Sequence, residues 1–480
     1  MAGMQQRPGL QPGAGGADPS VPPEYLAAVL RFVQETRLED LPPAVVDRAR
    51  RLIADCFAIV TAGNRSDELK AYADALLPAG GEGHSWVLGT GRRARARDAA
   101  FLNGIASTWH DFDEGSTIAY SHPGSQTIPA AVALAQERGA SGRELLLAVV
   151  LGYEVCARVG MASRMRVSVH PHGTVGTIGS AVAAAKLKRL ESAQLRHAIN
   201  IAATMAMTTN RQAMLDEATV RNVYSGHSAL AGLDAVQLAQ AGFTGQRDGI
   251  GFTYGTVIAD GFDPERMVDA LGEDWLILKG YFKLHSSGRY SHAAIDALQD
   301  ALAKVRGGTV DTARISRIEV RAFQMAALLS GQRITTSFGA KFSIPFALAT
   351  ILVHGRSAIE CFDLPAVRDP RVQALLAKVE VSEDLAHTAA YPGVQRCDLS
   401  IHFDDGYVVA GHCEVMKGEA GNPHRPEDVE RKYRDLMEPT WGRAHAARLY
   451  DNLMHLESIA DCRTFGLDDL PWNDPALEPR

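Results

Sequence analysis

The chain has 480 residues, of which 46% are apolar and only 7% aromatic, and its formal charge is −7. Charged residues make up 22% of the chain, as in folded proteins, and a mildly acidic balance gives no global electrostatic reason to bind nucleic acid or an anionic membrane. Because single hydrophobic cores stop growing near ~250–300 residues, the length predicts more than one domain. An apolar fraction rich in Ala and Leu, with 44 Gly, favours closely packed helices.

Neither the cysteines nor the N-terminus suggests export. The six cysteines form no C-x-x-C pair and match no zinc or iron–sulfur spacing, so we expect reduced, structural thiols in a cytoplasmic protein. Residues 1–22 are rich in Gly, Pro and Gln without an apolar segment, which predicts a disordered tail rather than a signal peptide. The longest apolar run, residues 145–159, is interrupted by Gly152 and Glu154 and is shorter than the ~18–20 residues that span a bilayer, so we expect no membrane segment.

Helical periodicity dominates the first part of the chain. Ser141 and Ser192 are placed as N-caps of two of these helices, and Glu144, three residues after Ser141, completes a capping box. The first helix is predicted to begin at Pro22-Pro23, where a missing N–H costs nothing. The other predicted helices cover, in chain order, residues 42–62, 95–109, 127–138, 141–159, 174–190, 192–207 and 226–241.

The pattern changes after residue 275. Strands are predicted where apolar and polar residues alternate, and a Gly turn at Asp404-Asp405-Gly406 predicts a β-hairpin. The predicted strands cover residues 315–321, 379–381, 397–403 and 407–415, and the predicted helices cover 287–304, 344–353 and 426–453. We therefore predict a mainly helical fold with an α+β second domain. A helical domain formed by residues 23–275 and 420–465 would be interrupted by a smaller α+β lid domain at 276–419.

Four segments could carry chemistry, and the first follows the helix at 95–109. It places Asp111, Asp113, Glu114 and two imidazoles, His110 and His122, within 13 positions. Acidic side chains are unfavourable at a helix C-terminus, so the sequence leaves open whether this is a functional loop or a solvated helix end. Magnesium is disfavoured, because ligands on one helical face lie three or four residues apart and Asp111 and Asp113 lie two apart. We predict no metal site.

The second and third segments bring imidazole and guanidinium groups. His170 and His172 precede a predicted helix, whose free N–H groups can hold an anion; for His172 we favour exposure to solvent, and for His170 the question stays open. Arg221 and Tyr224 lie three residues apart, and arginine can grip a carboxylate with two hydrogen bonds. The alternative for Arg221 is an ordinary surface arginine.

The fourth segment, which contains Lys283, Ser286 and Arg289, lies at the predicted domain junction. Clefts between domains are preferred ligand sites, and the alternative is a solvated linker. The chain contains no Walker loop, nucleophile elbow or dinucleotide-binding fingerprint. An inventory of His, Lys, Arg and Asp suits proton transfer on a small polyanionic carboxylic acid without a cofactor.

In this order, the four segments resemble the MmgE/PrpD family, which includes 2-methylcitrate dehydratase, cis-aconitate decarboxylase and iminodisuccinate epimerase. The resemblance extends over about residues 25–455 and is strengthened by Gly152-Tyr153-Glu154-Val155, Phe342-Ser-Ile-Pro345 and Asn422-Pro423. It implies a large helical domain that holds both termini, a smaller lid, an active site between them without a cofactor, and a homodimer.

The resemblance also implies site residues. Asp111, His122, His170 and Lys283 match positions that line the active site in the decarboxylase branch. Arg221 and Tyr224 stand where that branch has lysine and histidine, and the segment His285-Ser286-Ser287 departs as well. Because arginine keeps its proton near neutral pH, Arg221 would bind charge rather than donate a proton.

We therefore predict a cofactor-independent lyase or isomerase that moves a proton at a carbon next to a carboxylate of a small di- or tricarboxylic acid. His122 and His170 would be the acid and base, because imidazole titrates near neutral pH. The residues expected to contact substrate are Arg221, Tyr224, Arg289, Ser286 and Asp113, with Lys283 as a further cation. Dehydration or epimerisation is favoured over decarboxylation, and a non-catalytic carboxylate-binding protein on the same fold is the alternative from another class.

Overall fold

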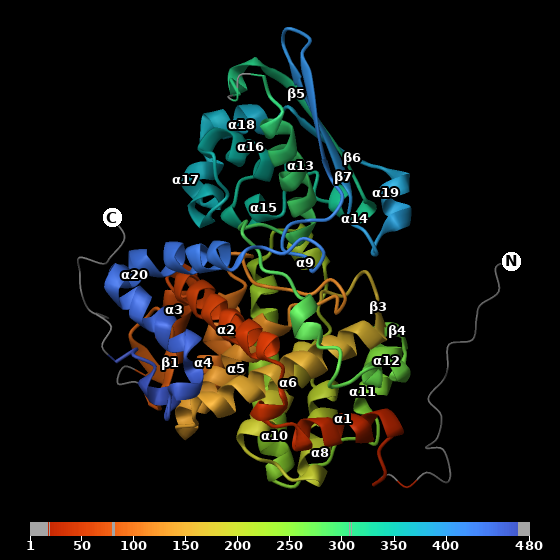
Figure 1. The fold of residues 1–480 in the computed structure, drawn as a ribbon, viewed down its shortest axis with the longest axis vertical. Helices are drawn as coiled ribbons and strands as arrows, with labels where there is room; N and C mark the ends of the chain where they lie inside the picture. Colours follow the sequence, from red (N-terminus) through yellow and green to blue (C-terminus); the bar gives the residue numbers. More distant parts are fainter. Residues whose placement is uncertain (1–17, 19, 79–81, 307, 309, 469–480) are drawn as a thin grey trace, which may run out of the picture.

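The computed structural model describes residues 18, 20–78, 82–306, 308 and 310–468. The fold is mainly helical with a smaller α+β part, as predicted, and the smaller domain sits at one end of the long axis of the molecule (Figure 1). Most of the predicted N-terminal tail, residues 1–17 and 19, lies outside the described residues.

The large domain is a bundle in which every helix predicted from the first part of the sequence is present, with ends shifted by a few residues. Two short antiparallel strand pairs, which the sequence analysis missed, join it: β1 (Ser85–Val87) forms a hairpin with β2 (Arg92–Ala94), and β3 (Ser163–Met165) pairs with the distant β4 (Ala259–Phe262). The helices are α1 (Glu24–Glu35), α2 (Pro43–Gly63), α3 (Asp67–Leu76), α4 (Ala96–Ser107), α5 (Pro123–Arg138), α6 (Gly142–Ala162), α7 (Gly176–Leu187), α8 (Ser192–Thr204), α9 (Gln212–Leu215), α10 (Val223–Gln240), α11 (Gly249–Phe252) and α12 (Pro264–Val268).

Helix α6 runs through the middle of this bundle. It has 21 residues, more than the apolar run marked in the sequence, and by length and composition alone it could cross a bilayer. However, 89% of its most apolar stretch is buried inside the protein, so contacts with other helices account for its apolar character. Its two internal charges, Glu154 and Arg158, pair at 2.9 Å, and Glu154 also accepts the backbone N–H of Leu276 at 2.9 Å.

Glycine lets the helices approach closely, as the composition predicts. Where α4 crosses α10, a Cβ atom added to Gly104 would lie 2.7 Å from the Cα of Gly226. Where α6 crosses α7, a Cβ atom on Gly152 would lie 2.6 Å from the carbonyl oxygen of Gly179. Both distances are shorter than carbon atoms tolerate, so these crossings require residues without a side chain.

The two predicted N-caps have different outcomes. Ser141 caps α6, and Ser141 and Glu144 form the expected capping box. The prediction for Ser192 is wrong, because the first backbone hydrogen bond of α8 joins the N–H of Leu195 to the carbonyl of Glu191 at 2.8 Å. Glu191 is therefore the N-cap, and Ser192 is already helical.

The smaller domain contains a four-stranded sheet with the order β6-β5-β7-β8. Strand β5 (Ile315–Ala322) pairs in parallel with β6 (Val379–Glu383) and antiparallel with β7 (Cys397–Phe403), which forms the predicted hairpin with β8 (Val408–Cys413). Helix α13 packs against β7 and β8. The helices of this domain are α13 (His292–Ala303), α14 (Gln324–Ala327), α15 (Ser337–Lys341), α16 (Ile344–His354), α17 (Leu364–Val367), α18 (Pro370–Leu376) and α19 (Leu385–Ala390).

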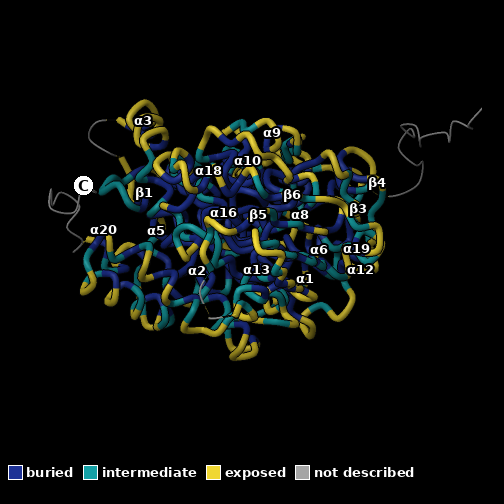
Figure 2. Tube along the Cα trace, turned by 90° about the horizontal axis from the view of Figure 1, so that it is seen from above, coloured by how far each residue is buried: buried dark blue, intermediate teal, exposed yellow. Residues whose placement is uncertain are grey.

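Each domain has its own hydrophobic core, and buried residues fill the interior of the molecule (Figure 2). Phe282 belongs to the first core and Ala293 to the second, so the chain passes between the cores over the intervening residues. The last helix, α20 (Pro426–Met454), returns to the first core beside α2. Its Lys432 ammonium pairs with Asp55 at 2.6 Å and donates to the carbonyl of Phe112 at 2.7 Å.

The glycine crossing of α4 and α10 yields a stability prediction. Gly104→Ala should lower the free energy of unfolding by about 1–3 kcal/mol, because the added methyl group forces the two helices apart. Urea unfolding followed by circular dichroism measures this loss. Gly331→Ala is the control, since a Cβ atom there meets its nearest neighbour only at 4.0 Å; equal stability of the two variants would contradict the packing argument.

Candidate active site

The predicted site residues meet where the chain crosses between the two cores. The loop after α4 supplies Asp111 and Asp113, and Asp111 has a φ of 48°, in the left-handed region that is uncommon for residues other than glycine. Lys283 reaches this loop from the crossing segment, and Arg221 reaches it from the turn before α10. Backbone strain of this kind persists only where the surroundings hold it, and it clusters at functional sites.

Two buried cations hold the two carboxylates. Lys283 Nζ donates to the backbone carbonyl of Asp111 at 3.0 Å, to its Oδ2 at 3.2 Å and to Asp113 Oδ1 at 3.4 Å. Arg221 Nη2 donates to Asp111 Oδ1 at 2.7 Å. Burial alone would raise the pKa of each carboxyl. At Asp111 the charges of Lys283 and Arg221 outweigh burial, and at Asp113 those of Lys283 and His122 do so. The pKa of Asp111 is lowered, and that of Asp113 lies well below its usual range.

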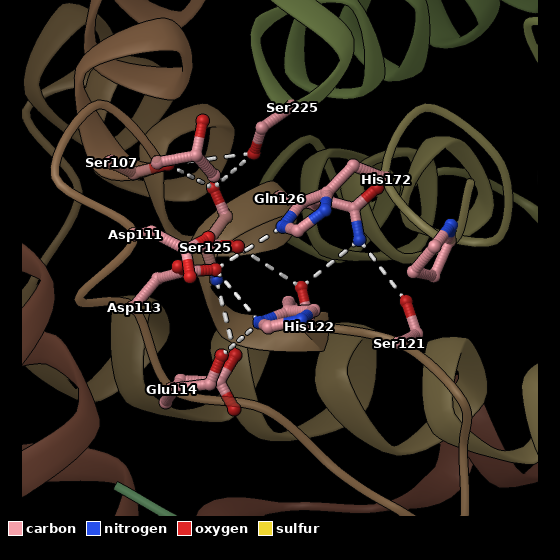
Figure 3. A network of polar contacts seen from close by, with 12 residues as sticks. Ser107, Asp111, Asp113, Glu114, Ser121, His122, Ser125, Gln126, His172 and Ser225 are labelled. Carbon is pink, nitrogen blue, oxygen red and sulfur yellow. Dashed lines mark hydrogen bonds and ion pairs between the residues drawn. The ribbon is translucent and has the colours of Figure 1, made fainter. Parts of the chain in front are cut away.

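His122 forms a dyad with Asp113. Its Nδ1 lies 2.8 Å from Asp113 Oδ2 and 2.6 Å from the carbonyl oxygen of Glu114 (Figure 3). Both neighbours are acceptors, so Nδ1 carries a hydrogen, and Nε2 is the ring nitrogen left for proton exchange with a ligand. The side chain is 12% exposed and lines the cavity described below. A carboxylate that orients a histidine in this way is the arrangement of a general base.

A second chain of imidazoles starts from the same carboxylate. His172 Nε2 lies 3.2 Å from Asp113 Oδ2, and its Nδ1 lies 3.4 Å from Nδ1 of His170. Arg221 Nε donates to His170 Nε2 at 3.3 Å. The backbone N–H of His172 also donates to His170 Nδ1, at 3.2 Å, so both ring nitrogens of His170 face N–H donors. Asp113, His172, His170, Arg221, Asp111 and Lys283 thus form a closed ring.

The prediction that His172 faces solvent is wrong. The residue is completely buried, because Asp113 accepts its Nε2 hydrogen and the turn at Gly173 is tied down by Gln126, whose Oε1 accepts the Gly173 N–H at 2.9 Å. Burial, His122 and Arg221 lower the pKa of His172 to about 3. Burial and Arg221 also hold the pKa of His170 well below its usual range, so both rings are neutral near pH 7.

Arg289 has polar partners at both terminal nitrogens but not at Nε. Its Nη2 pairs with Glu419 at 2.9 Å, its Nη1 donates to the carbonyl of Lys417 at 3.1 Å, and the guanidinium lies over the ring of Tyr281 at 4.1 Å. Its Nε is buried and has no hydrogen-bond partner among the described residues. An unpaired buried donor is costly, so a ligand oxygen is a natural partner for this N–H.

Two other residues predicted to contact substrate, Ser286 and Tyr224, do not line the cavity described in the next paragraph. The Ser286 hydroxyl donates to the carbonyl of His110 at 2.7 Å, and the Tyr224 ring packs beside His170 with centroids 5.7 Å apart. Neither residue lines the cavity, so in this structure both support the residues that do.

The cavity measures about 100 Å³ and draws its walls from both domains. Six of the predicted residues line it: Asp111, His122, His170, Arg221, Lys283 and Arg289. The sequence analysis missed Thr117, Ser121, Arg211, Tyr281 and Gln395, which also line it. Of these, Arg211 adds positive charge, because its Nε donates to the carbonyl of Val167 at 2.9 Å and no carboxylate pairs with it among the described residues. No sequence motif marked it.

Glu114, the third acid of the loop, has a different state from its neighbours. It accepts the backbone N–H groups of Gly124 and Ser125 at the start of α5 and the hydroxyl of Tyr153 at 3.2 Å. Burial and the nearby charge of Asp113 raise its pKa to about 8. Glu114 is therefore protonated at neutral pH, although it lies one residue from an acid that is fully ionised.

A metal ion could be held by only one set of donors among the described residues. Ligand atoms of Asp113, His122 and His172 lie within 4.8 Å of one another. The ammonium of Lys283, 3.4 Å from Asp113, opposes a second cation there, since like charges repel strongly in a buried site. The same carboxylate and imidazoles suit proton transfer without this conflict.

Two family models and several known proteins match this chain. The family model described as MmgE/PrpD N-terminal domain matches residues 27–272, and that described as MmgE/PrpD C-terminal domain matches residues 285–456. The cis-aconitate decarboxylase-like protein oryM of Aspergillus oryzae is 26% identical, over 91% of this chain and 95% of its own. The cis-aconitate decarboxylase of Homo sapiens is 27% identical, over 76% of this chain and 77% of its own. That of Mus musculus is 25% identical, over 90% of this chain and 90% of its own.

The raised pKa of Glu114 predicts a pH dependence of stability. Between the ordinary value of 4.5 and about 8 the folded protein holds a proton that the unfolded chain has lost, so this group makes the free energy of unfolding fall as the pH rises, by at most ~1.4 kcal/mol per unit. Glu114→Gln should therefore lose less stability than the wild type on going from about pH 5 to pH 8. Urea unfolding at both pH values measures the difference.

The exposed Glu273 provides the control, and Glu273→Gln should retain the wild-type pH dependence. If Glu114→Gln also retains it, Glu114 does not hold its proton in the folded state.

Proposed function

The chain belongs to the MmgE/PrpD family, and we propose that it moves a proton at a carbon next to a carboxylate of a small di- or tricarboxylic acid, without a cofactor. It is an enzyme of this family, with a lyase-like function. The observation that carries the proposal is the Asp113–His122 dyad, in which His122 lines a cavity together with Lys283 and Arg221.

In the proposed reaction His122 is the base. Nε2 accepts the proton from the substrate carbon, and Asp113, 2.8 Å from Nδ1, stabilises the imidazolium that forms. Loss of the proton leaves enediolate-like charge on the neighbouring carboxylate. Fixed cations in a dry cavity stabilise such charge more than water does, and Lys283, Arg221, Arg211 and Arg289 supply them.

His170 and Lys283 serve this step indirectly. Each N–H of the Lys283 ammonium already points to an oxygen of Asp111 or Asp113, so the lysine contributes charge and holds the loop. His170, neutral between Arg221 and His172, fixes the guanidinium that would bind a substrate carboxylate. We assign both to positioning and charge stabilisation.

Among lyase reactions we propose dehydration first, because abstraction of a proton from carbon is its opening step and the dyad is built to accept one. Decarboxylation is the second candidate, and the relatives named as cis-aconitate decarboxylases favour it. Proton NMR in D₂O with 2-methylcitrate, cis-aconitate and iminodisuccinate separates the reactions, since loss of water, loss of CO₂ and exchange without net change leave different products.

The dyad yields the first functional prediction. His122→Gln should lower turnover and solvent deuterium incorporation by about 10²–10⁴-fold, because the amide cannot accept the proton. The rates are measured by NMR on the best of the three acids. The exposed His84 is the control, and His84→Gln should keep wild-type rates. Unchanged exchange in folded His122→Gln would contradict the assignment of the base.

Arg289 yields a second functional prediction. Arg289→Lys should raise KM by about ten-fold with a smaller change in kcat, because lysine cannot hold Glu419 and Lys417 while also offering an N–H to the substrate. Steady-state kinetics measure both constants. The control is Arg314→Lys, which changes an arginine paired with the exposed Asp404 at 2.8 Å. An unchanged KM would exclude Arg289 from substrate binding.

A further inference from the structure

A second and larger cavity adjoins the catalytic one. It measures about 580 Å³ and lies along the seam between the domains, against β3, β4 and the start of α12. The two cavities share five wall residues: Tyr120, Pro171, Arg211, Tyr290 and Tyr391. We call the larger cavity the vestibule and these five residues the neck. The two cavities therefore adjoin each other at the neck.

Aromatic contacts hold the neck in place. The hydroxyl groups of Tyr290 and Tyr391 lie 3.2 Å apart, and the ring of Tyr391 stacks on Phe323 with centroids 4.9 Å apart. Tyr120 enters from the opposite domain, on a backbone with a φ of 47°. A ligand that extends from the catalytic cavity into the vestibule therefore passes between aromatic walls.

Beyond the neck the walls are mainly apolar. They include Ile118, Met161, Met165, Val167, Phe262 and Met325. Methionine side chains are flexible and polarisable and adapt to apolar ligands of different shape. The charged residues there are Arg164, Arg166, Asp263 and Arg266. Arg166 is paired with Asp260 at 2.7 Å and donates to the carbonyl of Val257 at 2.6 Å, so its own charge is compensated by protein groups.

We propose that the vestibule binds an alkyl substituent of the substrate, so that the enzyme prefers di- or tricarboxylic acids carrying an alkyl chain of several carbons over the unsubstituted acids. This inference rests on the proposed function. The carboxylates and the reacting carbon occupy the small polar cavity, and the chain passes the neck into the vestibule.

Exposed apolar side chains in the vestibule, and the residues that it shares with the catalytic cavity, favour an alkyl substituent as its occupant. Ile118 and Val167 are 38% and 67% exposed, and covering such side chains with a hydrocarbon chain is favourable. The neck residues border both cavities, so an occupant that reaches from one cavity to the other would carry the substituent on the same molecule as the reacting carbon. An independent ligand would instead compete with the substrate at the neck.

The test uses a series of acids in which only the chain grows: citrate and its 2-methyl, 2-butyl and 2-hexyl derivatives. Turnover and deuterium incorporation in D₂O give kcat/KM, and calorimetric titration gives the binding constant separately. We expect kcat/KM and binding to rise by about three-fold per methylene until the vestibule is filled.

Two matched variants locate the effect. Ile118→Trp places a large ring in the vestibule and should lower the ratio of hexyl to unsubstituted kcat/KM by about ten-fold. Leu278→Trp alters a side chain of nearly the same exposure, 40%, away from both cavities, and should leave this ratio unchanged.

Each outcome bears on one proposal or both. Turnover that is flat along the series overturns the vestibule inference and leaves the proposed function intact. Binding that rises with chain length, without turnover or exchange of any acid, supports the vestibule and overturns the proposed function. If no acid binds or reacts, both fail. If Ile118→Trp changes the molecular mass in solution, the surface is a contact between copies and the inference is overturned.

Discussion

One buried ammonium group, that of Lys283, is the contact on which the site depends. It neutralises two carboxylates of a loop from the helical domain, yet it belongs to the segment that crosses toward the second core. Removing one partner of a buried ion pair typically costs about 3–5 kcal/mol, because the remaining charge cannot be solvated. Without Lys283, two carboxylates would lose their counter-ion. The strained backbone of Asp111 and the orientation of His122 would then lose their support as well.

The ring around this ammonium explains how an acidic protein can receive an acidic substrate. Within the ring, two cations face two anions and two neutral imidazoles, so the buried charges balance without solvent. The surplus comes from Arg211, which among the described residues is bound to backbone carbonyls alone, and from Arg289, whose buried Nε has no partner there. The net charge of −7 therefore describes the outer surface, whereas two arginine groups set the local potential of the cavity.

The sequence analysis found the elements that have a strong local pattern and missed those that have none. Long helices and the β7–β8 hairpin carry periodicity or a Gly turn, whereas the strands β1 to β4 have only three or four residues, too few for a period to appear. The resemblance to a family selected Asp111, His122 and Lys283. It did not reveal the burial of His172, because that depends on Asp113, 59 residues away, and no local pattern records such a contact.

The last helix gives the site a dependence on the order of synthesis. Lys432 of α20 holds the carbonyl of Phe112, between the two catalytic-loop carboxylates, and pairs with the buried Asp55 of α2. Because α20 follows both α2 and the loop in the chain, Lys432 is synthesised after Asp55 and Phe112. Until this helix docks, Asp55 lacks its counter-ion and the carbonyl of Phe112 lacks its donor. The growing polypeptide should therefore remain catalytically silent until its final helix docks.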